Sequence, residues 1–369
     1  MSERAEAIVD LTVIEANLRS LQRPGVLTMA VVKADAYGHG AIPVARAARR
    51  AGAEWLGVAL PSEALALRRA GDTGPILAWL YPPGDPNLVA CVRADVDLNV
   101  GAVWAVDEVA AAARAAGKRA RVHLKVDTGL GRGGALPHTF DDILTAVLAH
   151  RSDVDVVGIW SHLASGEVAG AVETSEQIAA FDEALSLAQR RGIEPPLRHL
   201  ANSGGTLTNA GTHFDLVRLG IAMYGVPPGP QVDMAGLRPA MTLRASLASV
   251  KRVPPGHGVS YGLTWRAATE TTLALVPLGY ADGIPRTAVD PQVSVGGERV
   301  PVVGRIAMDQ FVVDVGDRDV APGDEVLVWG PGDAGEPTAQ DWATWDGTIG
   351  YEIVTRLGSR VPRRYLGDV

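Results

Sequence analysis

The fold of this chain is decided by the stretch LTMAVVKADAYGHGAIPVARAARRA, which spans Leu27–Ala51. Its first part, Leu27–Lys33, is a short and largely apolar run, as a strand buried on both faces of a sheet must be. Its last part, Ala41–Ala51, carries the Ala- and Arg-rich pattern of a helix. A buried strand followed closely by a helix indicates a parallel α/β unit.

The same alternation continues over roughly the first 225 residues, with a second clear helical pattern at Val103–Ala116. About eight strand–helix units in a segment of this length are typical of a (β/α)8 barrel, so we predict a TIM-type barrel. The strand-like runs are Leu27–Lys33, Trp55–Leu60, Ile76–Leu80, Asp97–Val100, Arg121–Thr128, Val154–His162, Leu197–Ala201 and Leu216–Met223.

The pattern changes after Gly225, where the Pro- and Gly-rich segment VPPGPQVDMAG is a plausible linker. Beyond it, strand-like runs recur with turn residues between them and without helices. We therefore predict two domains, a barrel over 1–235 and a mainly antiparallel β domain over 236–369. The later runs are Leu243–Val253, Thr272–Val276, Arg299–Val303, Gln310–Val315 and Glu325–Trp329.

Composition narrows the classes of function. The chain has 369 residues, 47% of them hydrophobic, and a formal net charge of -8. A net negative charge disfavours binding to nucleic acid. The N-terminus MSERAEAIVD has charges where a signal peptide needs an apolar core, and no run approaches the roughly 18 apolar residues of a membrane span. We expect a cytoplasmic protein without a membrane or nucleic-acid partner, and its single cysteine, Cys91, to be a buried core thiol.

Lys33 is the first candidate for chemistry, because the chain has only four lysines beside many arginines. A lysine kept in such a sequence suggests a need for an amine that can lose its proton. On a strand face with Leu27, Met29 and Val31, desolvation would favour the neutral, nucleophilic amine that forms a Schiff base. The alternative is a lysine at a strand end that reaches out to water.

Further motifs settle which family the chain resembles. The segment AVVKADAYGHG (Ala30–Gly40) is similar to the cofactor-lysine motif of the alanine racemase family, and other family motifs follow in order. They are HLKVDTGLGR (His123–Arg132), IWSHLA (Ile159–Ala164), HLANS (His199–Ser203), VRLGIAMYG (Val217–Gly225), VSYG (Val259–Gly262), LGYADG (Leu278–Gly283), GRIAMDQ (Gly304–Gln310) and GYE (Gly350–Glu352). The resemblance implies a pyridoxal-phosphate-dependent homodimer that interconverts L- and D-alanine and supplies D-alanine for peptidoglycan.

The resemblance also implies roles for single residues. Lys33 would carry the cofactor, and Lys33 and Tyr261 would be the two opposed acid/base groups, Lys33 acting on D-alanine and Tyr261 on L-alanine. The phosphate of the cofactor would be bound near the last two barrel strands, where barrels commonly hold phosphate. The residues implied there are Tyr37, Asn202, Ser203, Gly220, Ile221 and Tyr351. An ordinary turn would explain the glycine equally well without the other motifs.

Arg218 matches the family's arginine that faces the pyridine nitrogen. A guanidinium does not readily give up a proton, so the ring nitrogen would stay unprotonated. The alternative is a surface or core arginine paired with Asp215. His162 would pack beside the cofactor ring and join Arg218 in supporting Tyr261, although a lone histidine here could also be purely structural.

The run Arg121–Thr128 places His123, Lys125 and Asp127 on one face of a strand, where three polar groups need partners. The resemblance implies that Lys125 is carbamylated and positions Arg132 beside the substrate carboxylate. The alternative is an ion pair between Lys125 and Asp127 or a glutamate.

The second domain would contribute further groups to the site. Met308 would offer its backbone N–H to the substrate carboxylate, with Asp309 beside it, and the bulk of Tyr280 and Tyr351 would narrow the entrance. Ala307 stands where many members have cysteine, which would alter packing and inhibitor sensitivity. No residue is assigned to a metal.

Three other functions compete with alanine racemisation. A related barrel enzyme that decarboxylates basic amino acids would want an acidic group at the position of Arg218. A barrel that only binds pyridoxal phosphate would end before Tyr261, Met308 and Tyr351. A racemase of broader or different preference, for serine as an example, is excluded least well.

Overall fold

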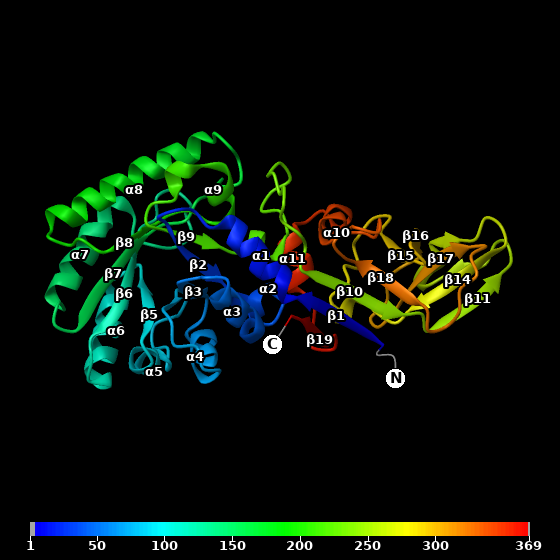
Figure 1. The fold of residues 1–369 in the computed structure, drawn as a ribbon, viewed down its shortest axis with the longest axis horizontal. Coiled ribbons are helices and arrows are strands. Elements are labelled where there is room, and N and C mark those ends of the chain that lie inside the picture. Colours follow the sequence, from blue (N-terminus) through cyan, green and yellow to red (C-terminus); the bar gives the residue numbers. More distant parts are fainter. Residues whose placement is uncertain (1–3, 368–369) are drawn as a thin grey trace.

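The computed structural model describes residues 4–367 and has two lobes joined side by side (Figure 1). One lobe is built from parallel strands surrounded by helices, and the other is built mainly from antiparallel strands. The two lobes follow each other along the chain for most of its length, as the colours in Figure 1 show.

The first lobe is an eight-stranded parallel barrel, with strand order β8-β7-β6-β5-β4-β3-β2-β9. The ladder register is continuous from β9 through β2 to β8, and backbone hydrogen bonds from Asp215 to Arg198 and from Arg218 to Ala201 join β8 to β9. The predicted TIM-type barrel is therefore confirmed as a nearly closed one. Its strands are β2 (Leu27–Val31), β3 (Trp55–Val58), β4 (Ile76–Ala78), β5 (Val96–Val100), β6 (Ala120–Lys125), β7 (Val154–Trp160), β8 (Leu197–His199) and β9 (Leu216–Leu219).

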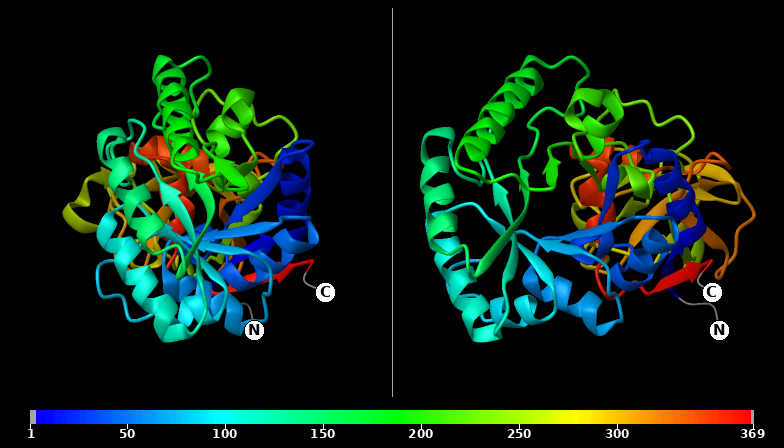
Figure 2. Two further views of the ribbon diagram at one scale, coloured as in Figure 1. Left: turned by 90° about the vertical axis from the view of Figure 1, so that its left-hand side faces the viewer. Right: turned by 60° about the vertical axis from the view of Figure 1, so that its left-hand side comes forward.

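Helices cover the outside of the barrel because each returns the chain to the start of the next parallel strand (Figure 2). The strands are almost completely buried, which agrees with their apolar composition. Cys91 lies on one of these helices and is buried, as expected. The helices of this lobe are α1 (Leu11–Leu21), α2 (Lys33–Tyr37), α3 (Ala41–Arg50), α4 (Pro61–Arg69), α5 (Leu88–Arg93), α6 (Val103–Ala116), α7 (Phe140–Ala149), α8 (Val172–Arg190) and α9 (Ser203–Thr208).

The second lobe is a nine-stranded, mainly antiparallel sheet of order β11-β14-β17-β16-β15-β18-β10-β1-β19. A two-stranded hairpin and two helices complete it. The strands are β1 (Ala5–Asp10), β10 (Met241–Ser246), β11 (Ser249–Val253), β12 (Gly258–Val259), β13 (Trp265–Arg266), β14 (Thr271–Val276), β15 (Gln292–Val295), β16 (Glu298–Val303), β17 (Phe311–Gly316), β18 (Glu325–Trp329) and β19 (Arg363–Leu366); the helices are α10 (Ala339–Asp346) and α11 (Gly350–Thr355).

The second sheet differs from the sequence-based expectation in two ways. The predicted strand Leu243–Val253 is two strands, β10 and β11, at separate places in the sheet. The first strand of the chain, β1, pairs with β10 and β19 of the second sheet. A domain boundary at residue 235 would therefore assign β1 to the barrel domain, although it belongs to the sheet of the second lobe. The boundary itself stays a prediction. Within residues 4–367, no helix combines the length and the apolarity needed to cross a membrane.

Candidate active site

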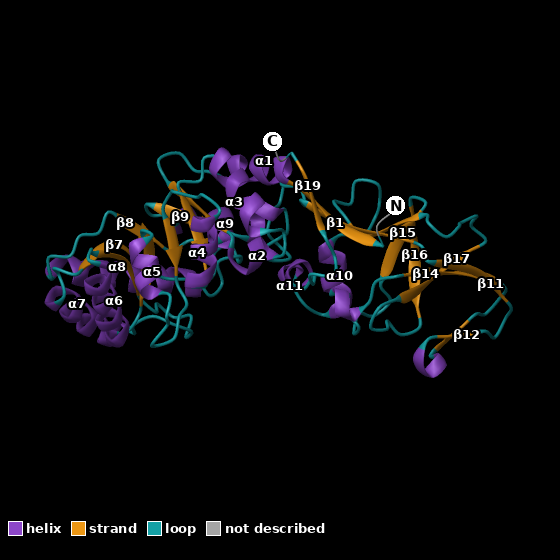
Figure 3. Ribbon diagram, turned by 90° about the horizontal axis from the view of Figure 1, so that it is seen from below, coloured by secondary structure: helices purple, strands orange, loops and turns teal. Residues whose placement is uncertain are grey.

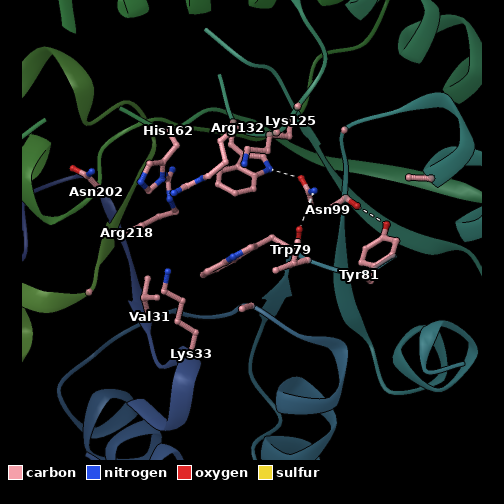
Figure 4. A pocket seen from close by; sticks show the side chains of 18 of the residues that line it. Val31, Lys33, Trp79, Tyr81, Asn99, Lys125, Arg132, His162, Asn202 and Arg218 are labelled. Carbon is pink, nitrogen blue, oxygen red and sulfur yellow. Dashed lines mark hydrogen bonds between the residues drawn. The ribbon is translucent and has the colours of Figure 1, made fainter. Parts of the chain in front are cut away.

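A cavity of about 680 Å³ opens at the carboxyl ends of the barrel strands. This is the end at which barrel enzymes assemble their sites, because loops from several strands converge there. Figure 4 shows the cationic side chains of Lys33, Lys125, Arg132 and Arg218 around the cavity, which they reach from different segments of the barrel. Of the residues singled out from the sequence, those that line it are Lys33, Tyr37, Lys125, Arg132, His162, Asn202, Ser203, Arg218, Gly220, Ile221 and Tyr351.

Lys33 lies just beyond β2, as the first residue of α2, and not on the strand face as predicted. Its Nζ lies 5.6 Å from the centre of the Trp79 ring and 5.8 Å from that of Tyr37. Burial, and then the charge of Arg132, lower the pKa of the Lys33 ammonium. A half-buried amine with a lowered pKa on the wall of the cavity favours nucleophilic chemistry over the alternative of a lysine that reaches out to bulk water.

The turn after Lys33 is left-handed over four residues that are not glycine, with φ of 52° at Ala34 and 54° at Tyr37. Such a conformation costs roughly 1–2 kcal/mol per residue, so it needs support from its surroundings. Glu63 accepts the N–H of Ala34 at 2.7 Å, and the buried Nδ1 of His39 bonds the carbonyls of Ala36 and Tyr37. The strained turn holds Lys33 and Tyr37 on the same side of the cavity.

Ser203, Gly220 and Tyr37 form one wall of the cavity. The Oγ of Ser203 accepts the backbone N–H of Gly220 at 2.9 Å, which leaves its own hydroxyl proton free to donate. A Cβ on Gly220 would lie 2.5 Å from the Tyr37 hydroxyl, so only glycine permits this approach. The Oδ1 of Asn202 accepts the backbone N–H of Gly205 at 2.9 Å and so caps α9 beside this wall.

Tyr351 extends the same wall from α11, with its ring 6.1 Å from that of Tyr37. Two phenols, a serine hydroxyl and a close glycine backbone make a wall suited to an anion.

Arg218 is almost completely buried, with 4% of its surface exposed. Its guanidinium donates to the carbonyls of Ser161, His199 and Leu200 at 2.9–3.1 Å and contacts His162 Nδ1 at 3.2 Å. The alternative pair with Asp215 is wrong, because Arg198 forms a bidentate ion pair with that carboxylate. Burial and the nearby cationic charge of Arg218 hold the pKa of His162 well below its usual value, so His162 is neutral.

Lys125 lies against an aromatic ring, with Nζ 4.6 Å from the centre of the Trp160 ring. Burial, and then the charges of Arg218 and Arg132, lower the pKa of Lys125 to about 8. Its alternative partner Asp127 instead accepts the N–H groups of Gly129 and Gly131. Within residues 4–367, Lys125 forms no ion pair with any carboxylate. The alternative of an ion pair between Lys125 and Asp127 or a glutamate is therefore wrong.

The structure does not bring four predicted site residues into the cavity of the same chain. Tyr261, Tyr280, Met308 and Asp309 lie on the second lobe, and Tyr261 is 69% exposed. Tyr261 belongs to a 3-10 turn beside β12, which projects from one side of the second sheet and lies well apart from the barrel (Figure 3). Asp309 is paired with Arg360 at 2.8 Å.

The sequence-based reading missed an aromatic part of the cavity. Trp160 donates from Nε1 to Asn99 Oδ1 at 2.9 Å, and Asn99 donates to the carbonyl of Trp79 at 3.2 Å. Tyr81 and Trp104 complete this side. The available signal was an amide or indole at the end of an otherwise aliphatic barrel strand.

Comparison with known proteins identifies the family to which the chain is similar. Residues 9–228 match the family model described as alanine racemase, N-terminal domain, and residues 240–365 match alanine racemase, C-terminal domain. The chain is 55% identical to the alanine racemase of Streptomyces coelicolor (99% of this chain, 96% of that protein) and 53% identical to that of Frankia casuarinae (98% and 96%).

Solved structures of alanine racemases superpose on the whole chain. The alanine racemase of a D-cycloserine-producing Streptomyces lavendulae superposes with a TM-score of 0.98 at 52% identity, over 100% of this chain and 98% of that one. The enzyme of Bacillus anthracis with bound L-Ala-P gives 0.92 at 36% identity, over 99% and 96%. With both of its domains matched, the chain belongs to the alanine racemase family.

Proposed function

We propose that this protein is an alanine racemase that uses pyridoxal phosphate to interconvert L-alanine and D-alanine. The observation that carries the proposal is one cavity at the barrel mouth that collects an amine of lowered pKa, a buried guanidinium and a wall of hydroxyl groups from separate elements of the fold. Membership of the family supports the racemisation of alanine as the reaction. The cavity contains side chains that could bind the cofactor and move protons in that reaction.

The residues of the cavity fit the cofactor. The Lys33 amine can hold it covalently, the wall of Tyr37, Ser203, Gly220 and Tyr351 suits its phosphate, and Ile221 lies beside that wall. Arg218 would face the ring nitrogen of the cofactor as a donor that keeps its proton. When bound, the cofactor withdraws electrons from the substrate and so acidifies its Cα–H bond.

Two bases on opposite faces of the substrate explain racemisation. One group removes the proton from Cα on one face, and the other delivers a proton to Cα on the other face, so atoms and charge balance without rotation of the substrate. We assign Lys33 Nζ to the proton of D-alanine and Tyr261 Oη to that of L-alanine. The neutral His162 and Arg218 would support the phenol, whose ordinary pKa of roughly 10 is high for a base.

The exposed position of Tyr261 supports a homodimer with shared sites. Tyr261 and Met308 are 69% and 52% exposed and lie on the lobe that does not hold the cavity of their own chain. In a head-to-tail dimer, the second lobe of one subunit would cover the barrel mouth of the other, bringing Tyr261, Tyr280, Met308 and Asp309 to Lys33.

Carbamylation of Lys125 would relieve the repulsion among the cationic side chains of the cavity. The charges of Lys33, Arg132 and Arg218 all act to lower the pKa of Lys125, so four cationic side chains share one space. Addition of CO2 to the neutral amine, with loss of one proton, would convert this lysine to an anion. The carbamate would then hold Arg132 in place for the substrate carboxylate.

A racemase of broader or serine preference remains the second candidate within the same chemistry. Arg218 argues against the decarboxylase, and the second lobe argues against a barrel that only binds the cofactor. We also propose that the protein acts in the cytoplasm, where it would supply D-alanine for peptidoglycan.

The experiment is to measure racemisation of a panel of L-amino acids by the purified, cofactor-loaded protein. We expect alanine to have the highest kcat/KM, because the bulk of Tyr280 and Tyr351 favours a methyl side chain. An equal or higher kcat/KM for serine would contradict the alanine assignment, and no racemisation of any substrate would contradict the reaction.

A further inference from the structure

A chain of hydrogen-bonded side chains crosses the interior of the barrel and ends on Arg218. Asp97 Oδ2 lies 3.1 Å from His123 Nε2, and His123 Nδ1 lies 2.9 Å from His199 Nε2. His199 Nδ1 lies 3.1 Å from the guanidinium of Arg218. These residues come from β5, β6, β8 and β9, and each is at most 4% exposed.

The direction of the chain follows from its two ends. A guanidinium only donates, so His199 Nδ1 must accept from Arg218 and His199 must carry its proton on Nε2. That proton is donated to His123 Nδ1, so His123 carries its own proton on Nε2 and donates it to Asp97. Asp97 closes the chain as an acceptor and is held by a bidentate ion pair with Arg121 at 2.7 and 3.2 Å. Each imidazole therefore has one tautomer only.

The packing around the two imidazoles fits this arrangement. The Trp160 ring stacks on His199 at 5.5 Å with 5° between the planes, and Trp55 meets His123 edge-on at 5.2 Å. Gly158 on β7 faces His123, where an added Cβ would lie 2.4 Å from Nδ1. A side chain at residue 158 would therefore displace the ring from His199.

We propose that Asp97 and His123 are positioning residues for Arg218: the acceptor that they provide at His199 Nε2 acts together with the Arg218 donor at Nδ1, and both are needed to hold His199 in its Nε2–H tautomer. In the opposite tautomer, the N–H at Nδ1 would face an N–H of Arg218 at 3.1 Å, and the guanidinium would lose an acceptor and its orientation. The inference rests on the proposed function in one respect, namely that Arg218 faces the cofactor.

A purely structural role for the same residues makes a different prediction. If Asp97 and His123 only fill the barrel, their loss lowers stability without changing the tautomer of His199 or the turnover of the folded enzyme. A stability measurement alone does not separate the two roles.

The test compares three substitutions in the full-length, cofactor-loaded protein. His123→Asn keeps an acceptor near the place of Nδ1, and His123→Leu removes it. Leu124→Ala is the matched control, because Leu124 is the next residue on β6, is fully buried and does not belong to the chain of hydrogen bonds. It reports what a destabilised barrel strand does by itself.

The first readout is solid-state 15N NMR of sedimented protein with 15N-labelled histidine, with the His199 signals assigned by loss in His199→Gln. We expect His199 to be protonated on Nε2 alone in the wild type, in His123→Asn and in Leu124→Ala, and a mixture of tautomers in His123→Leu. Protonation of His199 on Nδ1 in the wild type would overturn the proposal, whether or not the protein racemises alanine.

The second readout separates kcat from KM. We expect His123→Leu to lower kcat for alanine by about tenfold with KM within about twofold, because Arg218 acts on the cofactor and not on substrate binding. His123→Asn should stay within about threefold of the wild-type kcat, and Leu124→Ala should match the wild type. Wild-type kcat and tautomer in folded His123→Leu would overturn the proposal.

Should His123→Leu fail to fold, Asp97→Asn keeps the size of the side chain and replaces the carboxylate with an amide that both donates and accepts. Two tautomers at His123 and His199 are then expected. A single unchanged tautomer at His199 would contradict the proposed role of Asp97.

Discussion

The barrel mouth and the exposed edge of the second lobe carry the two halves of the predicted site, and they differ in almost every physical respect. At the barrel mouth, Arg218 and Ser203 are 4% and 3% exposed and have several hydrogen bonds each. On the second lobe, Tyr261 and Met308 are 69% and 52% exposed. The first half is organised within one chain, whereas the second half is presented outward.

The difference indicates which interactions orient the side chains of each half. At the barrel mouth, the guanidinium of Arg218 is held out of water by bonds to backbone carbonyls, so its orientation is set on folding. An exposed phenol has no such constraint until a second surface covers it. We therefore expect substitutions at the barrel mouth to act within one subunit, and substitutions on the second lobe to act on the partner's site.

The largest effect should come from Lys33→Ala. Loss of the amine removes both the covalent attachment and one base, so racemisation in both directions should fall by on the order of 10³-fold or more. Borohydride reduction of the wild type should fix the cofactor to the peptide of Lys33, as identified by mass spectrometry. Lys118→Ala, at an exposed ion pair with Asp95, is the matched control and should keep full activity. A label on Lys118, Lys125 or Lys251 would be incompatible with the assignment.

Tyr261→Phe should have the next largest effect, a fall in racemisation of on the order of 10²–10³-fold, typical of a lost acid/base group. Because Lys33 remains, exchange of solvent deuterium into D-alanine should outlast racemisation. The measurement is proton NMR of both enantiomers in D2O. Equal loss of exchange from L- and D-alanine would argue against separate roles for the two bases.

Mixed dimers give a smaller and more specific signal. Lys33→Ala and Tyr261→Phe subunits, denatured together and refolded, should recover about a quarter of wild-type activity, since half of the dimers are mixed and each has one intact site. Each parent refolded alone is the control. If mixed dimers are demonstrated by mass spectrometry and no activity returns, both bases come from one chain. A monomer in sedimentation at assay concentration would exclude sharing directly.

The smallest effect concerns the pH dependence of stability. Burial lowers the pKa of His39 from 6.5 to about 4, opposed by its bonds to the carbonyls of Tyr37 and Ala36. A lowered folded pKa means that the unfolded chain binds the proton first. Stability is therefore full above pH 6.5 and falls as the pH drops towards 4, by up to about 1.4 kcal/mol per pH unit for each such group.

His162 and His199 are lowered in the same direction and add to this slope. In His39→Asn, whose amide can replace the Nδ1 donor, the slope between pH 6.5 and 4 should decrease by about one proton. Urea denaturation at a series of pH values measures it. An unchanged slope would mean that His39 titrates alike in the folded and unfolded chain.

Much of the barrel could be predicted because its information is local. Each of its eight strand-like runs overlaps an observed strand, since an apolar run next to a helical pattern is readable within about 30 residues. The edge strands of the second sheet could not be read in this way. Glu6 on β1 is buried only because Arg244 and Arg364, more than 200 positions away, pair with its carboxylate.

The site also combines residues that local motifs predict with contacts that only the tertiary structure shows. The motifs predict that Lys33, Ser203, Arg218 and Tyr351 share one site, and all four line the cavity. The alternative partner for Arg218, the carboxylate of Asp215 three positions away, pairs with Arg198 instead. Alternate residues of β9 point to opposite sides of the strand. Arg218 points into the barrel, towards the imidazoles of His199 and His162.

The sequence by itself determined the alternation of strands and helices in the barrel, the family and the identity of the residues at the barrel mouth, because these depend on local pattern and on residue type. Tertiary structure alone decided the left-handed turn after Lys33, the line of side chains from Asp97 to Arg218 and the outward position of Tyr261. Each of these depends on groups that meet across the barrel or lie on separate lobes, and their geometry is fixed only when desolvation and long-range hydrogen bonds act together.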